Sequence, residues 1–298
     1  MSGKRDFPLN YRILSSLNRY SLLGPIRLIR GYLIKPYLTY KDKRIRILQA
    51  EEIEKLGNFG EIQVGKSRLY LYRKNLHDYL MLKTIEKGDL YEVEVTTYIR
   101  ENLMLGRTFV DLGANNGYYT IIGSELVGSS GKVLAIEPQP NAFERLEKNI
   151  LSNGLENVLA FKLALSDFTG TADIYLNEDS EDGLASLINS YNKKVVSKVD
   201  VKRFDDLFKN ENISLIKMDV EGSEILVIRG MSSYLETHPN VKIIMEWSPA
   251  YRTQEDFIYL NNIFNIYLLL FKSIKLSKIR ICKYYELPIF CNVLLEKR

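Results

Sequence analysis

Four apolar segments of this sequence each end in a carboxylate, and these acids are the residues best suited to chemistry. Among five apolar segments, the first, second, fourth and fifth close at Asp111, Glu137, Asp219 and Glu246. If the segments are neighbouring parallel strands, their carboxyl ends meet at one edge of a sheet, where ligands bind. Carboxylates gathered at such an edge can grip hydroxyl groups, remove a proton or hold a divalent ion.

The glycine turn after the first acid separates two classes of ligand. Residues 109–120, FVDLGANNGYYT, combine a short apolar run, a small-residue turn and a helix-like pattern. A dinucleotide fingerprint starting at Gly113 needs two further glycines where this chain has Asn115 and Tyr118. A carboxylate at Asp111 suits a ligand that carries an ammonium group and no phosphates. The alternative interpretation is a purely structural strand-to-helix turn.

Glu137 ends the second apolar segment and lies 24 positions after Gly113. This distance is close to the roughly 20-residue offset at which an acid meets ribose hydroxyls in nucleotide-binding sheets. A carboxylate offers two good acceptors to a vicinal diol. Pro138 and Pro140 favour the end of a strand and the first turn of a helix. We therefore expect Glu137 to contact a ribose.

The third segment, 158–163, is followed by Ser166 and Asp167, for which two interpretations are equally supported. At a strand end these side chains can meet an adenine amine or its ring nitrogens. Serine and aspartate also favour helix caps and turns without any ligand.

Acids are most concentrated after the fourth segment, in residues 217–224, KMDVEGSE. Glu224 has an ordinary explanation, because helix starts favour acidic residues. The remaining acids lie at the end of a strand expected to neighbour the first one, which makes them candidates for a reaction centre. The same acids could bind Mg²⁺ and acidify a hydroxyl, but without histidine or an octahedral ligand set we expect no metal. The candidate catalytic residues are Asp219 and Glu221, supported by Lys217 and Glu246.

These motifs occur in an order that is typical of FkbM-type methyltransferases, and the sequence resembles that family. The resemblance covers roughly residues 90–250 and rests on the strings YEVEVTTYI, FVDLGANNGYYT, IEP, ALSD, KMDVEGSE and IIMEWSP. It implies a class I, Rossmann-like fold that binds S-adenosylmethionine and methylates a hydroxyl group of a sugar or polyketide.

The resemblance also implies roles for individual residues. Asp219 and Glu221 would lie at the reaction centre. Asn116 stands where the family often has an apolar residue, and we expect no functional consequence from this departure. Cofactor contacts are implied for Asp111, Gly113, Asn115, Gly117, Glu137 and Asp167, to which we add the neighbouring Tyr118, Pro138 and Ser166.

Alternating strand and helix patterns define the expected fold. They run to about residue 270 and predict a doubly wound α/β sheet, mostly parallel with an antiparallel C-terminal strand. We expect this methyltransferase domain to span 88–298. A basic helical extension, 1–87, would precede it and contain a small hairpin at 61–73.

A polar loop interrupts this alternation. Two strand-like segments, 172–176 and 197–201, flank residues 177–194, which are rich in Asp, Glu, Ser and Gly. A long loop within a compact domain is usually functional or disordered. This one would overhang the strand ends, so we interpret it as a substrate lid. Residues 289–295 are expected to form a final buried strand.

Composition agrees with a globular enzyme. The chain has 298 residues, of which 46% are hydrophobic and 26% charged. Two cysteines, Cys282 and Cys291, and two isolated histidines, His77 and His238, predict neither a disulfide framework nor a Cys/His metal site. The scarcity of histidine shifts the expected base to an acid, lysine or tyrosine. A net charge of +4 is too modest to favour a nucleic acid partner.

The N-terminal region leaves two interpretations open. The sequence has no run of about 18 apolar residues and no secretory cleavage site, so we expect a cytoplasmic protein. Basic and apolar residues interleave over 10–46. We favour a helix packed on the catalytic domain, and the alternative is peripheral contact with an anionic membrane. Nothing in the sequence indicates an oligomeric state.

The function expected from these observations is S-adenosylmethionine-dependent O-methylation. The acceptor would be a small molecule or glycan, with its hydroxyl on a sugar, a glycolipid or a polyketide-like compound. One alternative is an NAD-dependent oxidoreductase or epimerase, which the glycine spacing disfavours, as does the lack of a Tyr-x-x-x-Lys pair beside the fourth strand. Another is a cofactor-binding module without activity.

Overall fold

The computed structural model describes residues 43–177, 193–248, 252–272, 275–288 and 291–298. The chain divides into two compact units, Met1–Glu51 and Glu52–Arg298. Residues 43–51 of the first unit are helical. Of the basic segment 10–46, for which packing on the domain or membrane contact was considered, only the last four residues are described. Within the described ranges, no helix has both the length and the apolar character that crossing a bilayer requires.

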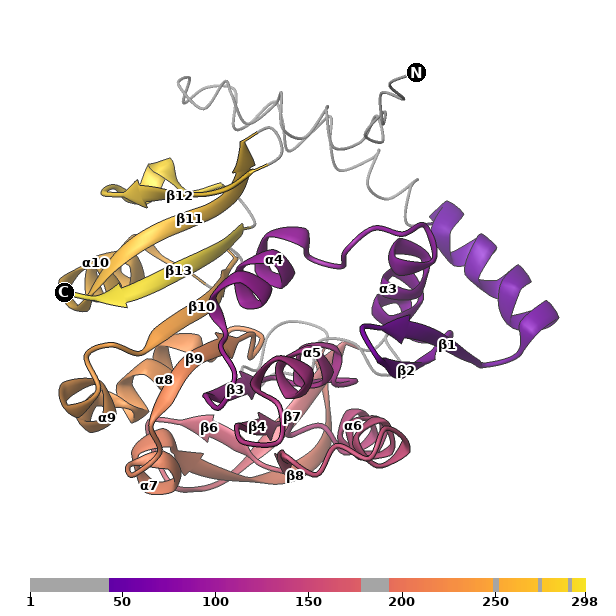
Figure 1. The fold of residues 1–298 in the computed structure, drawn as a ribbon, viewed down its shortest axis with the longest axis horizontal. Helices are drawn as coiled ribbons and strands as arrows, with labels where there is room; N and C mark the ends of the chain where they lie inside the picture. Colours follow the sequence, from indigo (N-terminus) through magenta and orange to yellow (C-terminus); the bar gives the residue numbers. More distant parts are fainter. Residues whose placement is uncertain (1–42, 178–192, 249–251, 273–274, 289–290) are drawn as a thin grey trace. The chain divides into compact units, whose positions relative to one another are not determined.

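The second unit is built on an eight-stranded sheet (Figure 1) with the strand order β12-β11-β13-β10-β9-β3-β4-β5. Strands β10, β9, β3, β4 and β5 pair in parallel, which confirms the predicted doubly wound α/β class. The antiparallel part is larger than predicted, because three C-terminal strands join by antiparallel pairing. The strands are β3 (Thr108–Leu112), β4 (Lys132–Ile136), β5 (Val158–Phe161), β9 (Ile213–Met218), β10 (Lys242–Trp247), β11 (Phe264–Lys272), β12 (Lys275–Ile281) and β13 (Cys291–Lys297).

Helices cover both faces of the parallel strands, as Figure 1 shows for α5 and α6 on one side and α8 and α9 on the other. One group comprises α4 (Val93–Asn102), α5 (Tyr118–Val127) and α6 (Pro140–Ser152). The other comprises α7 (Phe204–Phe208), α8 (Glu224–Gly230), α9 (Ser232–Thr237) and α10 (Gln254–Ile263). A 3-10 turn, η1 (Tyr284–Glu286), precedes β13.

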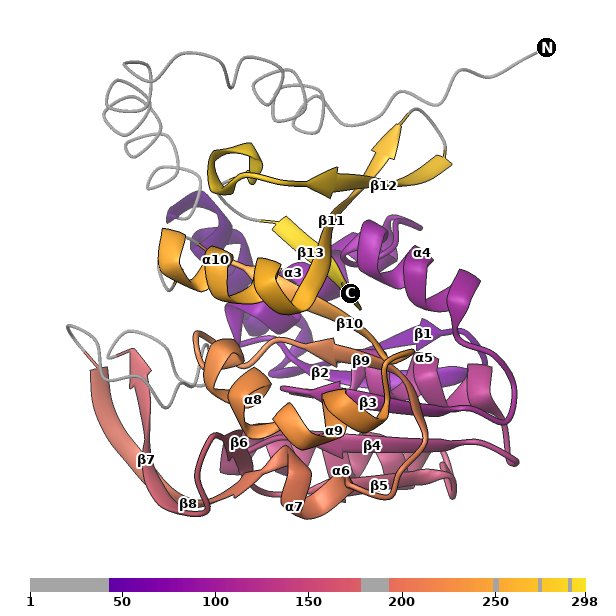
Figure 2. The same ribbon diagram turned by 90° about the vertical axis from the view of Figure 1, so that its left-hand side faces the viewer.

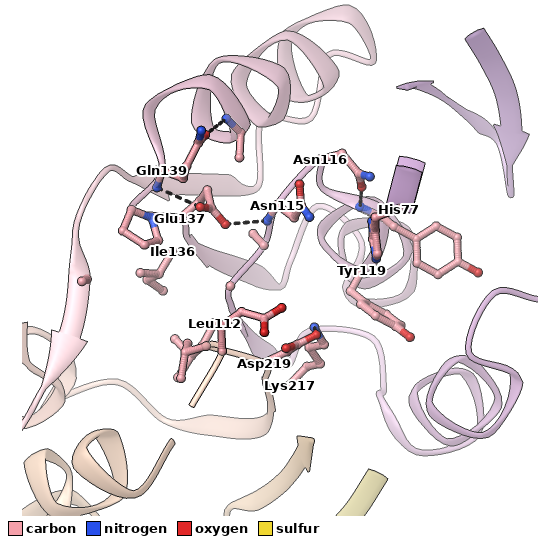
Figure 3. Close-up of a pocket in the computed structure, with 18 of the residues that line it drawn as sticks. His77, Leu112, Asn115, Asn116, Tyr119, Ile136, Glu137, Gln139, Lys217 and Asp219 are labelled. Atoms are coloured by element: carbon pink, nitrogen blue, oxygen red, sulfur yellow. Dashed lines mark hydrogen bonds and ion pairs between the residues drawn. The ribbon is translucent and has the colours of Figure 1, made fainter. Parts of the chain in front are cut away.

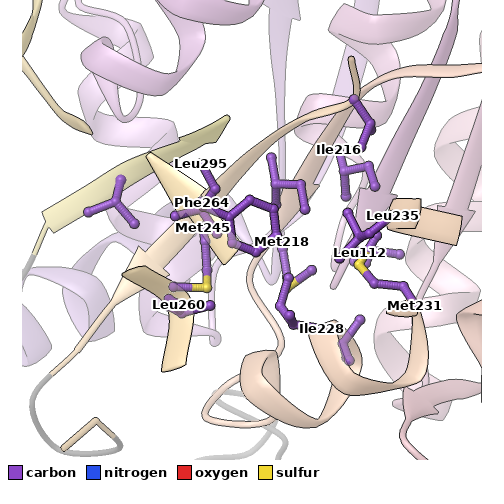
Figure 4. Packing of buried hydrophobic residues seen from close by; sticks show 14 of the residues in the cluster. Leu112, Ile216, Met218, Ile228, Met231, Leu235, Met245, Leu260, Phe264 and Leu295 are labelled. Carbon is purple, nitrogen blue, oxygen red and sulfur yellow. The ribbon is translucent and has the colours of Figure 1, made fainter. Parts of the chain in front are cut away.

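Successive residues of the central strands feed two separate hydrophobic cores. Phe109 of β3 joins the core under α4, α5 and α6. Its neighbour Val110 joins the core under α8, α9 and α10, together with Met218 and Met245, as drawn in Figure 4. Side chains alternate across a strand, and both faces are buried here, so the strand sequences are apolar throughout rather than alternating. An acid at the end of such a strand therefore stands out in the sequence.

The predicted hairpin is present and packs on the sheet domain. Strands β1 (Phe59–Val64) and β2 (Ser67–Tyr72) pair antiparallel. Two asparagine side chains, from Asn149 of α6 and from its C-cap Asn153, complete the free edge of β2. Asn149 bonds both backbone groups of Tyr70, and Asn153 bonds both of Arg68, at 2.7–3.1 Å. The hairpin and the following α3 (Leu76–Glu86) thus belong to the unit that starts at Glu52, whereas the sequence analysis placed the domain boundary at 87/88.

A smaller sheet contains the strands expected around the polar loop. It has the order β6-β8-β7, with β6 (Ala164–Ser166), β7 (Gly170–Asn177) and β8 (Lys193–Arg203). Figure 2 shows β7 and β8 as a ribbon that extends away from the central sheet. The loop between them, interpreted as a lid, lies almost wholly outside the described residues.

Candidate active site

A pocket opens at the carboxyl ends of β3, β4 and β9. Its wall consists of residues that follow these strands, together with His77 from α3 and with Tyr91 and Glu92 ahead of α4. The empty space between these residues, open solvent at the mouth included, is about 1110 Å³. Figure 3 shows Glu137 on one side of Asn115 and His77 on the other. We call these two parts of the wall the Glu137 side and the His77 side.

Three wall residues have a left-handed backbone, which residues other than glycine rarely adopt. They are Glu92, Asn115 and Glu221, with φ of 40°, 49° and 50°, and the described ranges contain no other non-glycine residue with positive φ. Such conformations cost on the order of 1–3 kcal/mol each and cluster at functional sites. The three residues come from three different loops, so the fold maintains strain around this pocket from several directions.

Gly113 brings two of these loops into direct contact. Its φ is 77°, and a Cβ at this position would collide with the backbone carbonyl of Asp219. The Asp219 amide also donates to the carbonyl of Leu112 at 3.0 Å. Gly113 is therefore needed for the close approach of the β3 and β9 loops, in addition to lining the pocket.

Glu137 lies in the wall, where it orders the Glu137 side. Its two carboxylate oxygens accept from the backbone amides of Asn115 at 2.8 Å and Gln139 at 2.9 Å. Burial raises its pKa to about 7, although both backbone donors work against this change. Each oxygen has a second lone pair, so the group can still accept from a ligand diol. Pro138 follows it in the wall.

Asp111 is fully buried and does not line the pocket. The next residue, Leu112, does line it. One oxygen accepts from Thr120 Oγ1 at 2.6 Å, and burial raises its pKa, partly offset by the charge of Lys217. A direct contact between Asp111 and a ligand therefore stays a prediction. Its observed role is to tie β3 to the first turn of α5.

The other predicted cofactor residues divide into two groups. Tyr118 lines the pocket, whereas Gly117 forms the cap of α5 just outside it. Ser166 is buried at the end of β6, with its Oγ 3.3 Å from Asp167 Oδ1, and neither side chain lines the pocket. Their neighbour Leu165 does line it, so an adenine contact by Asp167 also stays a prediction.

Lys217 and Asp219 form an ion pair in the wall. Lys217 Nζ lies 3.0 Å from Asp219 Oδ2 and 5.0 Å from the centre of the Tyr119 ring. Burial works to lower the pKa of this lysine, but Asp219, Asp111 and Glu92 outweigh it and raise the pKa above its ordinary value. Lys217 is thus a fixed positive charge among acids.

Glu246 approaches this pair from β10 without lining the pocket. Burial, followed by repulsion from Asp219 and Glu92, raises its pKa to about 7, and Lys217 opposes the change. The supporting role of Glu246 stays a prediction.

Three acids come close enough together to suggest a metal site. One carboxylate oxygen from each of Asp219, Glu224 and Glu246 lies within 4.8 Å of the other two. However, Lys217 pairs with Asp219, and Arg252 pairs with Glu224, which also accepts from two backbone amides of its own loop. Two of the three acids are thus already paired with buried cations, so the donor set does not fit a divalent ion.

Sequence reasoning missed the part of the His77 side that comes from α3 and from the turn before α4. Tyr119 donates to Glu92 at 2.6 Å, and Tyr91 is hydrogen-bonded to His77 at the same distance. His77 appeared isolated because Tyr91, its hydrogen-bond partner, is 14 residues away in the sequence. Asn116, for which we expected no consequence, is 1% exposed and donates to buried Asp78 at 2.8 Å. An amide replacing an apolar residue in a buried turn was the available signal.

Comparisons with known proteins agree with the motif assignment. Residues 111–270, more than half of the chain, match the model of the methyltransferase FkbM domain. Methyltransferase sdnD of Sordaria araneosa is 25% identical over 207 residues, which cover 58% of this chain and 79% of that protein. The protein-L-isoaspartate O-methyltransferase of Methanococcus aeolicus is 27% identical over 172 residues, which cover 53% and 80% of the two chains.

Among solved structures, the FkbM methyltransferase of Methylobacillus flagellatus KT is 17% identical with a TM-score of 0.40. It covers 74% of this chain and 53% of its own. The family match and the strand-end motifs around the pocket lead to the same conclusion: this chain belongs to the FkbM family and is an S-adenosylmethionine-dependent methyltransferase.

Proposed function

We propose that this methyltransferase transfers the methyl group to a hydroxyl oxygen of a sugar, glycan, glycolipid or polyketide-like acceptor. The observation that carries the proposal is the division of one pocket into a Glu137 side and a His77 side with different chemistry. The first presents acceptors for a nucleoside. The second gathers hydroxyl, imidazole, ammonium and carboxylate groups, which are suited to a polar, hydroxyl-rich molecule.

The Glu137 side has the features that the cofactor needs. Bound S-adenosylmethionine supplies an electrophilic methyl group on a positively charged sulfur. Glu137 is held by the Asn115 and Gln139 amides in a position to accept from ribose hydroxyls. We assign Gly113, Asn115, Tyr118 and Pro138 to the cofactor wall with it. Asp111, Gly117, Ser166 and Asp167 support that wall or its rim.

The His77 side would hold the acceptor. We assign Asp219 and Glu221 to anchor the acceptor hydroxyl or take its proton, with Lys217 and Glu246 setting their charge. Positioning provides most of the rate acceleration, because holding the hydroxyl in line with an activated methyl group removes most of the barrier to transfer. The Methanococcus aeolicus relative is named an O-methyltransferase, which supports oxygen as the receiving atom.

Two measurements test this function. Calorimetry with S-adenosylhomocysteine should show binding, and NADH should show none. Transfer from labelled S-adenosylmethionine is then measured on a panel of glycosides, glycolipids, phenols and hydroxy acids beside matched amines and thiols. Labelling of hydroxyl compounds is the expected result. Labelling confined to amines or thiols would contradict O-methylation while leaving the methyltransferase assignment intact.

A further inference from the structure

His77 occupies a position that the family match does not reach. It lies in the first turn of α3, upstream of the matched residues 111–270, yet its side chain lines the pocket and is 36% exposed (Figure 3). The only other histidine of the chain, His238, stacks on Tyr234 at 4.1 Å and is not part of the pocket wall. The pocket thus contains one imidazole, delivered by the element that follows the hairpin.

A buried carboxylate stands behind this imidazole. Asp78 is fully buried, and its Oδ1 lies 3.7 Å from His77 Nδ1. The Asp78 oxygens accept from the Tyr72 amide at 2.9 Å and from Asn116 Nδ2 at 2.8 Å, while Arg145 lies 3.9 Å away. Asp78 is therefore fixed by β2, by α6 and by the glycine turn after β3. Its position is set by the same turn that builds the Glu137 side.

The imidazole also has a partner toward the pocket. His77 Nε2 lies 2.6 Å from the Tyr91 hydroxyl, which lines the pocket. If Tyr91 donates to Nε2, the tyrosine oxygen can still accept a hydrogen bond from a molecule in the pocket. Asp219 is less available for this task, because it shares its charge with Lys217 at 3.0 Å.

We propose that His77 is the final acceptor of the proton that leaves the substrate hydroxyl, with Tyr91 relaying it and Asp78 positioning the imidazole. This inference rests on the proposed O-methylation. The hydroxyl oxygen forms the new O–C bond, and the C–S bond breaks with its electron pair remaining on sulfur. The hydroxyl proton moves to the Tyr91 oxygen as the Tyr91 proton moves to His77 Nε2. One positive charge passes from the sulfonium to the imidazolium, where Asp78 stabilises it.

The surrounding charges favour a protonated His77 after methyl transfer. Burial works to lower the pKa of His77, but Asp78 outweighs it with help from Glu92 and Asp219, so the pKa is raised above 6.5. Burial works to raise the pKa of Asp78, but His77 and Arg145 hold it below 3.8. Asp78 therefore stays charged at neutral pH and can balance an imidazolium. Since neutral His77 is the form that takes up a proton, turnover should rise with pH through the raised pKa.

The test uses the full chain, because its two histidines give two resolvable imidazole signals in NMR of protein labelled at histidine. His77→Gln identifies the His77 signal, and His238→Gln is the matched control. We expect His77 to titrate above 6.5, to respond to S-adenosylhomocysteine, and to titrate lower in Asp78→Asn. A His77 that titrates normally and ignores Asp78→Asn would overturn the proposal. Thermal melts test whether the Asp78→Asn variant is folded. If this variant is unfolded, the titration of His77 in the original chain alone tests the proposal.

The second readout is turnover on the best hydroxyl acceptor from the panel. General base groups contribute about 10²–10⁴-fold, so kcat should fall about a hundredfold in His77→Gln and in Tyr91→Phe. The Kd for S-adenosylhomocysteine should stay within about threefold, and His238→Gln should match the original chain. Full turnover in His77→Gln with an unchanged pH profile would overturn this inference alone. Failure of the original chain to methylate any hydroxyl would instead overturn the proposed function beneath it.

Discussion

The Glu137 side and the His77 side of one pocket are built in different ways. The Glu137 side comes from loops directly after β3 and β4, so its residues lie within a short stretch of sequence. The His77 side combines α3, the turn before α4 and the loop after β9, which are distant in the chain. The first side lies within the family match at 111–270, and much of the second lies outside it. The matched range thus supplies the Glu137 side, whereas the His77 side also uses residues that precede this range.

Hydrogen bonds join the two sides. Asn116 follows directly after Asn115 of the Glu137 side and donates to Asp78, the neighbour of His77. Gly113 lets the β3 loop pass against the backbone of Asp219. We infer that ordering the cofactor turn also orders the acceptor wall, so the two sides are coupled in structure while differing in task.

The largest effect is expected from Gly113→Ala, which acts on both sides at once. The added Cβ meets the Asp219 carbonyl and also forces a residue with a side chain to keep φ at 77°. We expect S-adenosylhomocysteine affinity and methyl transfer each to fall more than about a hundredfold, with a lower melting temperature. Calorimetry, a transfer assay and a thermal melt measure the three quantities.

Gly88→Ala is the control for that substitution. Gly88 has a φ of 79° but open space around its missing Cβ, so it reports backbone strain alone, about 1–2 kcal/mol. If Gly113→Ala and Gly88→Ala lose equal stability and both keep their affinity for S-adenosylhomocysteine, the close contact between the β3 and β9 loops is not needed for cofactor binding.

The second prediction separates the acceptor side from the cofactor side. Asp219→Asn preserves shape but removes the charge that pairs with Lys217 at 3.0 Å. Transfer should fall about a hundredfold, while S-adenosylhomocysteine affinity changes only a few-fold, because Asp219 serves the acceptor. Glu221→Gln should show the same pattern at smaller amplitude. Unchanged turnover in both variants would place the chemistry elsewhere.

The sequence predicted the Glu137 side well because its signals are local. An apolar strand, a glycine turn and an acid 24 positions later are visible without any knowledge of packing. The same holds for the hairpin at 61–73, the strands beside the polar loop and the β9 acids. The family resemblance added the cofactor and the class I fold, and both are confirmed.

The parts of the fold and of the site that the sequence did not predict depend on tertiary contacts or come from ambiguous patterns. Strand β11 comes from an apolar stretch without clear period, which suits a buried helix as well as a strand. No local pattern links His77 to Tyr91 or Asn116 to Asp78, because the partners are 14 and 38 residues apart in the sequence. Asp111 is buried and does not line the pocket, and its position in the motif does not indicate this burial.

The third prediction concerns Glu137→Gln and its pH dependence. Loss of a charged acceptor costs about 1.5–3 kcal/mol, so S-adenosylhomocysteine affinity should fall roughly 10- to 150-fold. At saturating cofactor, kcat should be nearly unchanged. The exposed Glu144 of α6 provides a matched control, Glu144→Gln, which should behave like the original chain.

Because burial raises the pKa of Glu137 to about 7, its charged form is partly lost just below neutral pH. Affinity should therefore weaken as pH falls through about 7 and level off above it, and this dependence should vanish in Glu137→Gln. Folding stability has the opposite sign. A carboxyl whose folded-state pKa is raised binds more protons when folded, so its contribution to stability declines as pH rises from about 4.5 to 7. A flat affinity between pH 6 and 8 in the original chain would contradict the assigned ligand role.

The smallest effect distinguishes the two interpretations of the ALSD motif. Asp167 is exposed at the rim, and only its neighbours Ala164 and Leu165 line the pocket. If Asp167 accepts from the adenine amine, Asp167→Asn loses one exposed hydrogen bond worth about 0.5–1.5 kcal/mol, which is a two- to twelvefold loss of affinity. The loss should be absent for an S-inosylhomocysteine probe, which has no such amine. Equal affinities of the variant and the original chain for S-adenosylhomocysteine would instead assign Ser166 and Asp167 to a turn, leaving adenine recognition to the apolar wall beside them.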